Sequence, residues 1–347
     1  RFQRLRNTNL VRRLGTMLNI PMAAFQGNQQ EAIDAVIQGD SPIVYITGTG
    51  GGKSLTFILP TYCTPDGITI VIVPFVALQE DLHKRCHTMS IRCEIWSTTC
   101  IQTTPIILVT PESFSTKQFR DWVNRLAIQH ELNQIVFNEC YTILDSSYQF
   151  HPQIRAIRAL LLTFGTQLVF LTATLPPQDE AKFFTTLHLP RHQATIIQQY
   201  TTRHNISYII HQAISKEEVD KVIIQAIESW LAISPKEKII LYCQRVDHTE
   251  EVAQLLGYSA YHGKVAKAKE KSQIIRQWLD HGGPIMATNT LGTGIDIPNI
   301  QTTIHVRLPR SLRNFVQESG HTGQDGHTSH SVIIFTKSHT ISQASRD

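Results

Sequence analysis

Residues 43–57 read IVYITGTGGGKSLTF, an apolar run that leads into three consecutive glycines and then into Lys53 and Ser54. IVYI predicts a buried strand, and the apolar residues after Ser54 predict a helix. Glycine has no Cβ, so the backbone at residues 50–52 can approach a phosphate group closely. Backbone N–H groups and the start of the helix then face the anion. The segment predicts a phosphate-binding loop, and a plain glycine turn is the less favoured alternative.

Two side chains of this loop suit particular parts of a bound nucleotide. Lys53 can reach the outer phosphates as a point charge, and the Ser54 hydroxyl can ligand Mg²⁺. The sequence therefore predicts ATP and Mg²⁺ as cofactors. The expected nucleotide-binding residues of the loop are Thr49, Gly50, Gly51, Gly52, Lys53 and Ser54.

Short apolar runs alternate with helical patterns along most of the chain, which predicts parallel sheets with crossover helices. A first set of expected strands comprises VYIT, TIVIV, IILVT, IVFN and LVFLT. A second set comprises IILYC, YSAYHG, PIMAT, TTIHVRL and SVIIF. Polar residues near 195–212 break the pattern, so we expect the two halves to join there. The pattern predicts an α/β chain built from two mainly parallel sheets flanked by helices.

One helix of the second half is marked by its own sequence. Ser215 and Glu218 form a capping box before VDKVIIQAIESWL. Apolar residues then fall on one helical face, which predicts core packing rather than a binding groove. They are Val219, Val222, Ile223, Ala226 and Trp230.

Composition excludes several classes of protein. The 347 residues are 41% hydrophobic and 17% charged, which is typical of a globular chain with two domains. No apolar run approaches the roughly 18 residues of a membrane span, so no membrane partner is expected. The six cysteines form no CxxC pair, which predicts intracellular thiols and no structural zinc. A net charge of +4 points only weakly to a polyanionic partner.

Residues 1–20 form a basic segment, and no acid precedes Glu31. Two interpretations stay open: a transit peptide, against which the low serine content speaks, and a solvated basic arm near nucleic acid. The arginines concerned are Arg1, Arg4, Arg6, Arg12 and Arg13.

From about residue 20 to about residue 336 the chain resembles the RecQ family of DNA helicases, in superfamily two. The resemblance rests on the order and spacing of many short motifs. In chain order they are FQGNQQEAI (25–33), TGTGGGKS (47–54), PFVALQEDL (74–82), VTPES (109–113), NECY (138–141), FLTATLPP (170–177), TRHNISY (202–208), LYC (241–243), AYHG (260–263), MATNTLGTGIDIP (286–298) and QESGHTGQDG (317–326).

The resemblance implies two RecA-like domains of a P-loop helicase core, at residues 21–200 and 201–340, with ATP between them and a tail at 341–347. It implies movement in the 3′-to-5′ direction on single-stranded or partly unwound DNA, driven by ATP hydrolysis. It also implies a role in DNA repair or recombination. The protein would act in the nucleus if it is eukaryotic, and otherwise inside the cell. Protein partners stay unknown.

Further site residues follow from the resemblance alone. The nucleotide-binding residues that it adds are Gln29, which would read adenine, Asp296 and Gln317. The expected DNA-binding residues are Pro74, Thr110, Phe150 and Thr288. For Phe150, stacking on a base and packing in the core are equally favoured interpretations.

VFNECYTILD, residues 136–145, departs from the family's acidic motif. The first acid of that motif organises Mg²⁺, and the second orients the attacking water. Asn138 replaces the first acid and keeps only an oxygen acceptor, whereas Glu139 retains the second. Tyr141 stands where the family has histidine. We expect catalysis to involve Glu139 and Asn138, with Mg²⁺ held by Ser54 and Asn138.

The last motif departs further, because His321 and Gln324 stand where the family places arginines against the γ-phosphate. Neither side chain reproduces a fixed guanidinium. Loss of an arginine finger typically lowers the rate by about 10³ to 10⁵. The sequence therefore predicts a weakened helicase, and the alternative is a catalytically inactive module that binds nucleotide and DNA.

The departures share a direction at the nucleotide level. Asp to Asn at 138, His to Tyr at 141, Arg to His at 321 and Arg to Gln at 324 each need a single G:C-to-A:T transition. Cytosine deamination in a decaying gene copy would produce this set. A divergent but functional subfamily is the alternative, and the codons would distinguish the two.

Overall fold

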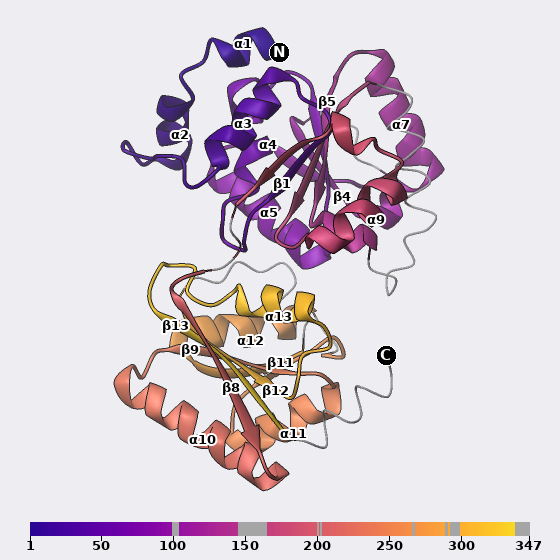
Figure 1. The fold of residues 1–347 in the computed structure, drawn as a ribbon. Helices are drawn as coiled ribbons and strands as arrows, with labels where there is room; N and C mark the ends of the chain where they lie inside the picture. Colours follow the sequence, from indigo (N-terminus) through magenta and orange to yellow (C-terminus); the bar gives the residue numbers. More distant parts are fainter. Residues whose placement is uncertain are drawn as a thin grey trace. The chain divides into compact units, whose positions relative to one another are not determined.

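The computed structural model describes residues 1–98, 104–144, 165–199, 201, 203–265, 268–288, 291 and 299–336. The chain divides into two compact units, Arg1–Thr201 and Thr202–Asp347. Each unit contains one sheet in which all neighbouring strands run parallel, with helices on both faces (Figure 1). The predicted α/β class with two parallel sheets is confirmed. In the described residues, no helix is both long enough and apolar enough to cross a membrane.

The sheet of the first unit has the strand order β3-β4-β2-β5-β6-β1-β7. Its strands are β1 (Ile43–Ile46), β2 (Ile68–Ile72), β3 (Cys93–Ile95), β4 (Ile106–Val109), β5 (Leu132–Asn138), β6 (Gln167–Thr172) and β7 (Thr195–Gln198). The helices are α1 (Phe2–Arg6), α2 (Leu10–Leu18), α3 (Gln29–Gln38), α4 (Leu55–Cys63), α5 (Val76–Thr88), α6 (Pro111–Phe114), α7 (Lys117–Ile128) and α9 (Pro177–Leu187), with 3₁₀ turns η1 (Cys140–Leu144) and η2 (Arg191–Gln193).

Strand β1 lies inside this sheet and is buried on both faces. Ile43 and Tyr45 pack into the core that includes α3, α4 and α5. Val44 and Ile46 pack into the opposite core, which includes α7 and α9. Successive side chains of a strand point to opposite faces, so a strand covered on both sides needs an unbroken apolar run. This explains why IVYI shows no alternation of apolar and polar residues.

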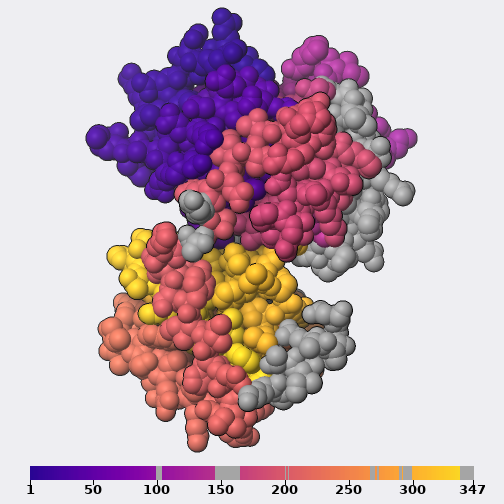
Figure 2. Space-filling model, in the orientation of Figure 1, coloured from indigo at the N-terminus to yellow at the C-terminus, as the bar shows by residue number. Residues whose placement is uncertain are grey.

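The N-terminal segment is part of the first unit and not a solvated arm, which corrects one of the two interpretations above. Leu5 of α1 and Leu14 of α2 are fully buried in the core that also holds α3 and α4. Arg1 donates from Nη1 to the Asn133 carbonyl oxygen at 3.0 Å, and burial lowers its pKa to about 10. The N-terminal segment, in indigo, packs against the rest of the first unit (Figure 2).

The sheet of the second unit has the strand order β10-β11-β9-β12-β13-β8. Its strands are β8 (Ile206–Ala213), β9 (Lys238–Cys243), β10 (Ala260–Tyr261), β11 (Gly283–Ala287), β12 (Ile300–Val306) and β13 (Ser329–Thr336). Its helices are α10 (Lys216–Ile233), α11 (Val246–Leu256), α12 (Ala268–His281) and α13 (Leu312–Ser319). Helices α10 and α11 contribute to the core on one face of the sheet, and Trp278 of α12 packs on the other.

The capping box of α10 is confirmed. The Glu218 N–H donates to Ser215 Oγ at 3.3 Å, and Glu218 Oε2 accepts from the Ile214 N–H at 2.6 Å. The fully buried side of the helix is Val219, Ile223 and Ile227, so the apolar face lies slightly to one side of the predicted one.

The two units meet between Thr201 and Thr202, inside the range 195–212 where the join was expected, but this range also contains parts of two strands that the sequence did not predict. Strand β7 occupies 195–198 and pairs with β1, while β8 occupies 206–213 and pairs with β13. Both strands lie at the edge of their sheet, so each has a neighbouring strand on one side only. Polar residues are tolerated in strands at such edges. Their mixed composition hid them from a search for apolar runs.

Candidate functional site

The phosphate loop begins where β1 ends, between the carboxyl ends of its two neighbours β6 and β7. Thr47 donates its N–H to the Thr172 carbonyl oxygen of β6 at 3.1 Å. Gly50 and Gly52 have φ angles of 78° and 66°, a left-handed backbone that favours glycine. Helix α4 starts at Leu55, directly after Ser54. This is the strand–loop–helix arrangement that the sequence predicts.

Lys53 and Glu139 are brought together at this loop. Their Nζ and Oε1 atoms are 3.8 Å apart, and their side chains are only 10% and 19% exposed. The Lys53 ammonium also donates to the carbonyl oxygens of Thr47 and Gly48 at 3.2 and 3.4 Å. The Lys53 ammonium therefore lies among the carbonyl oxygens of its own loop and the Glu139 carboxylate.

Glu139 owes its position to an uncommon backbone conformation. Its φ is 53°, a left-handed value that non-glycine residues adopt rarely. The Thr142 N–H and hydroxyl both donate to the Glu139 carbonyl oxygen, at 3.1 and 2.9 Å, and hold this turn. Asn138, the last residue of β5, is 8% exposed. Burial raises the pKa of the neighbouring Cys140 thiol well above its usual value.

Gln29 contacts the phosphate loop through its side chain. Its Nε2 donates to the Gly51 carbonyl oxygen at 3.1 Å, and its Oε1 accepts from the Gln26 N–H at 2.9 Å. A Cβ at Gly52 would lie 2.2 Å from that Nε2 atom, so the third glycine makes room for this contact. The residue expected to read adenine is thus tied to the residues expected to hold phosphate.

The two DNA-binding candidates of the first unit lie at the carboxyl ends of neighbouring strands. Pro74 comes after β2 and Thr110 comes after β4, and these two strands pair in the sheet. The Thr110 hydroxyl accepts from the Ser113 N–H at 3.3 Å and caps α6. Phe150 lies outside the residues that the structure describes.

In the second unit, the loop after α13 carries His321 and Gln324. His321 is 6% exposed, and Gln324 Nε2 donates to the Gly320 carbonyl oxygen at 3.3 Å. Arg203 donates to the carbonyl oxygens of Gly320, at 3.0 Å, and of Gly323. Burial lowers the pKa of Arg203. The loop that lacks the family's arginines is therefore held by an arginine that precedes β8.

The other candidates of this unit are scattered around the same sheet. Thr288, after β11, is 6% exposed and donates its N–H to the Tyr261 carbonyl oxygen at 3.2 Å. Gln317 lies on α13, one residue before the buried Glu318. Asp296 lies outside the described residues.

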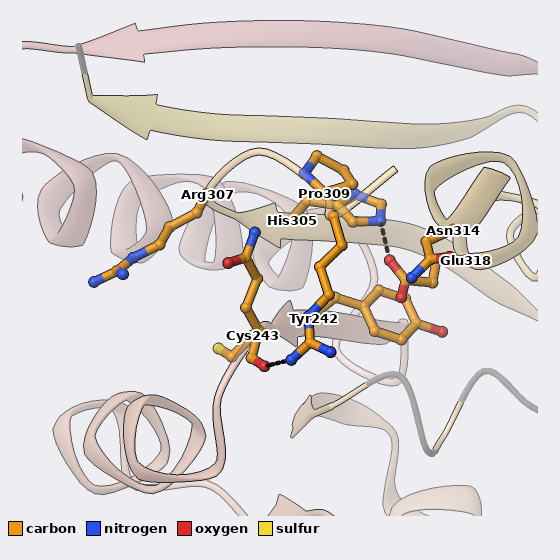
Figure 3. A pocket seen from close by; sticks show the side chains of 9 residues that line it. Tyr242, Cys243, His305, Arg307, Pro309, Asn314 and Glu318 are labelled. Atoms are coloured by element: carbon orange, nitrogen blue, oxygen red, sulfur yellow. Dashed lines mark hydrogen bonds and ion pairs between the residues drawn. The ribbon is translucent and has the colours of Figure 1, made fainter. Parts of the chain in front are cut away.

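Helix α13 is joined to the sheet by a buried polar pair, which Figure 3 shows at the edge of a small pocket. Glu318 Oε2 is 3.0 Å from His305 Nε2. The His305 ring stacks on Tyr242, with 5.4 Å between the ring centroids. Arg310 donates to the Gln244 carbonyl oxygen at 2.6 Å. The pair of Glu318 with His305 ties the end of α13 to β12, and the loop with His321 continues from there.

Sequence reasoning missed three residues that contact the predicted loops: Gln199, Arg203 and Asn205. Gln199 accepts a hydrogen bond from the Thr47 hydroxyl at 3.1 Å. Asn205 Nδ2 donates to the carbonyl oxygens of Gly323 and His327, each at 2.8 Å. Arg203 and Asn205 belong to the motif TRHNISY, but each contact joins residues far apart along the chain, so no local pattern indicated the contacts themselves.

Comparison with known proteins agrees with this geometry. Residues 26–183 match the DEAD/DEAH box helicase family, and residues 218–326 match the helicase conserved C-terminal domain. The chain is 28% identical to the ATP-dependent DNA helicase Q5 of Rattus norvegicus over 341 residues, covering 89% of this chain. It is 27% identical to the RecQ-like DNA helicase BLM of Xenopus laevis over 336 residues, covering 90%.

The chain therefore carries the two domains of a helicase core, and its relatives include RecQ-like DNA helicases. It spans 34% of the length of the helicase Q5 relative and 24% of the BLM relative. Among solved structures, Saccharomyces cerevisiae Dbp5 bound to RNA and ADP BeF3 superimposes with a TM-score of 0.75. That alignment covers 96% of this chain and 89% of Dbp5 at 16% identity, so it bears on the fold alone. The two sheets therefore share the fold of RecA-like helicase cores.

Proposed function

We propose that this RecQ-like chain binds ATP and Mg²⁺ and couples slow hydrolysis to 3′-to-5′ movement on single-stranded DNA. The observation that carries the proposal is the phosphate loop, in which Lys53 lies 3.8 Å from Glu139. A cation for phosphate and a carboxylate for water are the two groups that hydrolysis needs at this end of the nucleotide. Work on DNA would place the protein in the nucleus of a eukaryotic cell.

The residues present fit the nucleotide and its metal. Gly50 and Gly52 give the loop its left-handed backbone, and the absence of a Cβ at Gly52 leaves room for the Gln29 amide. Ser54 and Asn138 would hold Mg²⁺ through oxygen atoms, the ligands that Mg²⁺ prefers. When bound, Mg²⁺ neutralises charge that develops on the phosphates.

The chain's own residues would divide the work as follows. The Lys53 ammonium would exchange its contacts with the Thr47 and Gly48 carbonyl oxygens for phosphate oxygens. Glu139 would orient the attacking water and accept its proton. His321 and Gln324 would leave the transition state without the guanidinium groups of the family. Because ground-state binding does not speed the chemical step, intact binding by Lys53 cannot compensate.

The second candidate is a catalytically inactive module that binds nucleotide and DNA. The observation in its favour is that Asn138 carries no charge and His321 is 6% exposed. A buried side chain in that loop cannot reach a phosphate as a long, flexible arginine could.

An ATPase assay with and without single-stranded DNA distinguishes these functions. Slow turnover that DNA stimulates supports the weakened helicase, whereas nucleotide binding without turnover supports the inactive module. Stimulated turnover at about 1 to 100 s⁻¹, the range of kinases, would contradict the weakening. Failure to bind ATP would reject both candidates.

A further inference from the structure

Gln199 lies beside the start of the phosphate loop because of strand register. Strand β7 pairs with β1 so that Gln198 lies opposite Ile46. Gln199 extends this ladder by donating its N–H to the Ile46 carbonyl oxygen at 2.9 Å. Thr47 is the first residue after β1, so the side chains of Gln199 and Thr47 meet at the edge of the sheet where phosphate is expected.

The Thr47 hydroxyl donates a hydrogen bond to the Gln199 side chain. Thr47 is 2% exposed, and its Oγ1 donates to Gln199 Oε1 at 3.1 Å. A buried hydroxyl without an acceptor is destabilising, so this bond favours one position of Thr47. On its other side, the Thr47 N–H is held by Thr172 of β6. The first residue of the loop is therefore fixed from both neighbouring strands.

The same glutamine packs against the turn that precedes α3. A Cβ at Gly27 would lie 2.3 Å from Oε1 and 2.4 Å from Nε2 of Gln199, so the amide lies directly over this glycine. Gly27 has a φ of 50°, which also favours glycine. Two residues later in the chain, Gln29 donates to the Gly51 carbonyl oxygen. The turn at residues 26–29 thus contacts Gln199 and the middle of the phosphate loop.

We propose that Gln199 is a positioning residue for the nucleotide. Its amide would hold Thr47 and the turn at residues 26–29 together, so that the phosphate loop and Gln29 keep one arrangement. The proposal rests on the nucleotide binding proposed above. It predicts that the Thr47–Gln199 hydrogen bond contributes to ATP affinity although neither side chain has been assigned to the nucleotide.

A double-mutant cycle tests this contact. We expect Gln199→Ala to raise the Kd of a fluorescent ATP analogue with Mg²⁺ by about 2- to 10-fold, the effect of one hydrogen bond. Thr47→Val removes the donor with little change of shape and should raise the Kd to a similar extent. The double variant should bind no more weakly than either single variant, because the same bond is lost. Gln198→Ala, at the exposed neighbouring residue of the same strand, is the matched control.

A conservative variant separates positioning from packing. Thr47→Ser keeps the hydroxyl and should bind the analogue as the unchanged chain does, whereas Thr47→Val should not. Thermal unfolding of each variant shows whether it folds. If Gln199→Ala does not fold, the comparison of Thr47→Ser with Thr47→Val still tests the hydrogen bond. Unchanged affinity in Gln199→Ala, or losses that add in the double variant, would overturn the proposal. If the unchanged chain binds no ATP, the proposed function fails as well. If it binds, and Lys53→Ala does not, only the role of Gln199 is at stake.

Discussion

Lys53 makes the sharpest test at the level of a single residue. Replacement by alanine removes the ammonium that the loop carbonyls now surround, and phosphate would lose its main cation. We expect Lys53→Ala to abolish detectable binding of ATP with Mg²⁺ in calorimetry or fluorescence titration. Lys84→Ala, at an exposed lysine of the same unit, should bind ATP unchanged. Binding that survives in Lys53→Ala would show that the nucleotide lies elsewhere.

The lost charges predict how activity returns. Asn138→Asp alone should help little, because the cations near the γ-phosphate would still be missing. His321→Arg with Gln324→Arg should help only partly, because Mg²⁺ would stay poorly organised. The triple variant should gain more than the product of the separate gains, since these groups act as one unit. The measurement is kcat of the unchanged chain and the three variants, at saturating ATP and single-stranded DNA.

The buried position of His321 sets the control for that experiment. Its side chain is 6% exposed, so an arginine there needs room that histidine does not take. Thermal unfolding should therefore accompany each kcat. A folded triple variant that binds ATP but is no faster than the unchanged chain would place the defect outside these three positions.

The conformation of the phosphate loop gives a prediction at the level of the element. Gly52→Ala should cost about 1 to 2 kcal/mol for the left-handed backbone and also push the Gln29 amide away. Gly257 ends α11 at a φ of 72° with no atom within 4 Å of an added Cβ. Gly257→Ala should therefore lose similar stability and keep ATP affinity, whereas Gly52→Ala should lose both. Urea unfolding and nucleotide titration of the pair measure the two effects, and equal ATP affinity in both variants would contradict the assignment of the loop.

The cap of α10 predicts a loss of stability without a direct effect on nucleotide. Ser215→Ala removes the acceptor of the Glu218 N–H and should lower the free energy of unfolding by about 0.5 to 2 kcal/mol. Ser229→Ala, on an exposed turn of the same helix, is the control and should change it little. Urea denaturation measures both. A loss no larger than that of Ser229→Ala would mean that the Ser215 bond contributes nothing to α10.

The sequence predicts those strands in which every residue is buried. Strand β1 is buried at every position, so its apolar run is unmistakable. Strand β8 is buried only at Ile206 and Ala213, because it lies at the edge of its sheet. Its polar and exposed residues match no strand period, and its existence follows from pairing with β13 instead.

The site divides in the same way. Lys53, Thr47 and Gly48 fall within one short motif, so the sequence alone predicts that they belong to the same loop. The contact of Thr47 with Gln199 joins residues 152 positions apart. Only the register of β7 on β1 creates that contact, and register is a property of the folded sheet.

At the scale of the whole molecule, DNA binding should show two separable components. The logarithm of the binding constant for single-stranded DNA should fall linearly with the logarithm of the salt concentration. The slope should be about −0.7 for each phosphate neutralised. Phe150→Ala should weaken binding by about 1 to 3 kcal/mol if the ring stacks on a base, and it should leave the slope unchanged. Fluorescence anisotropy over a salt series measures both. Unchanged affinity with a lower unfolding temperature would instead favour core packing of Phe150.

The pairing of β8 with β13 also constrains how the second unit is made. Strand β13 lies between β12 and β8 in the sheet, yet it comes last of the three in the chain. During synthesis, which proceeds from the N-terminus, β8 emerges from the ribosome more than a hundred residues before β13, the one strand that pairs with it among the described residues. Until Ser329–Thr336 follows, the nascent unit exposes an unpaired strand that includes Tyr208, Ile209 and Ile210. Such a strand is a natural substrate for chaperones that bind extended apolar chain.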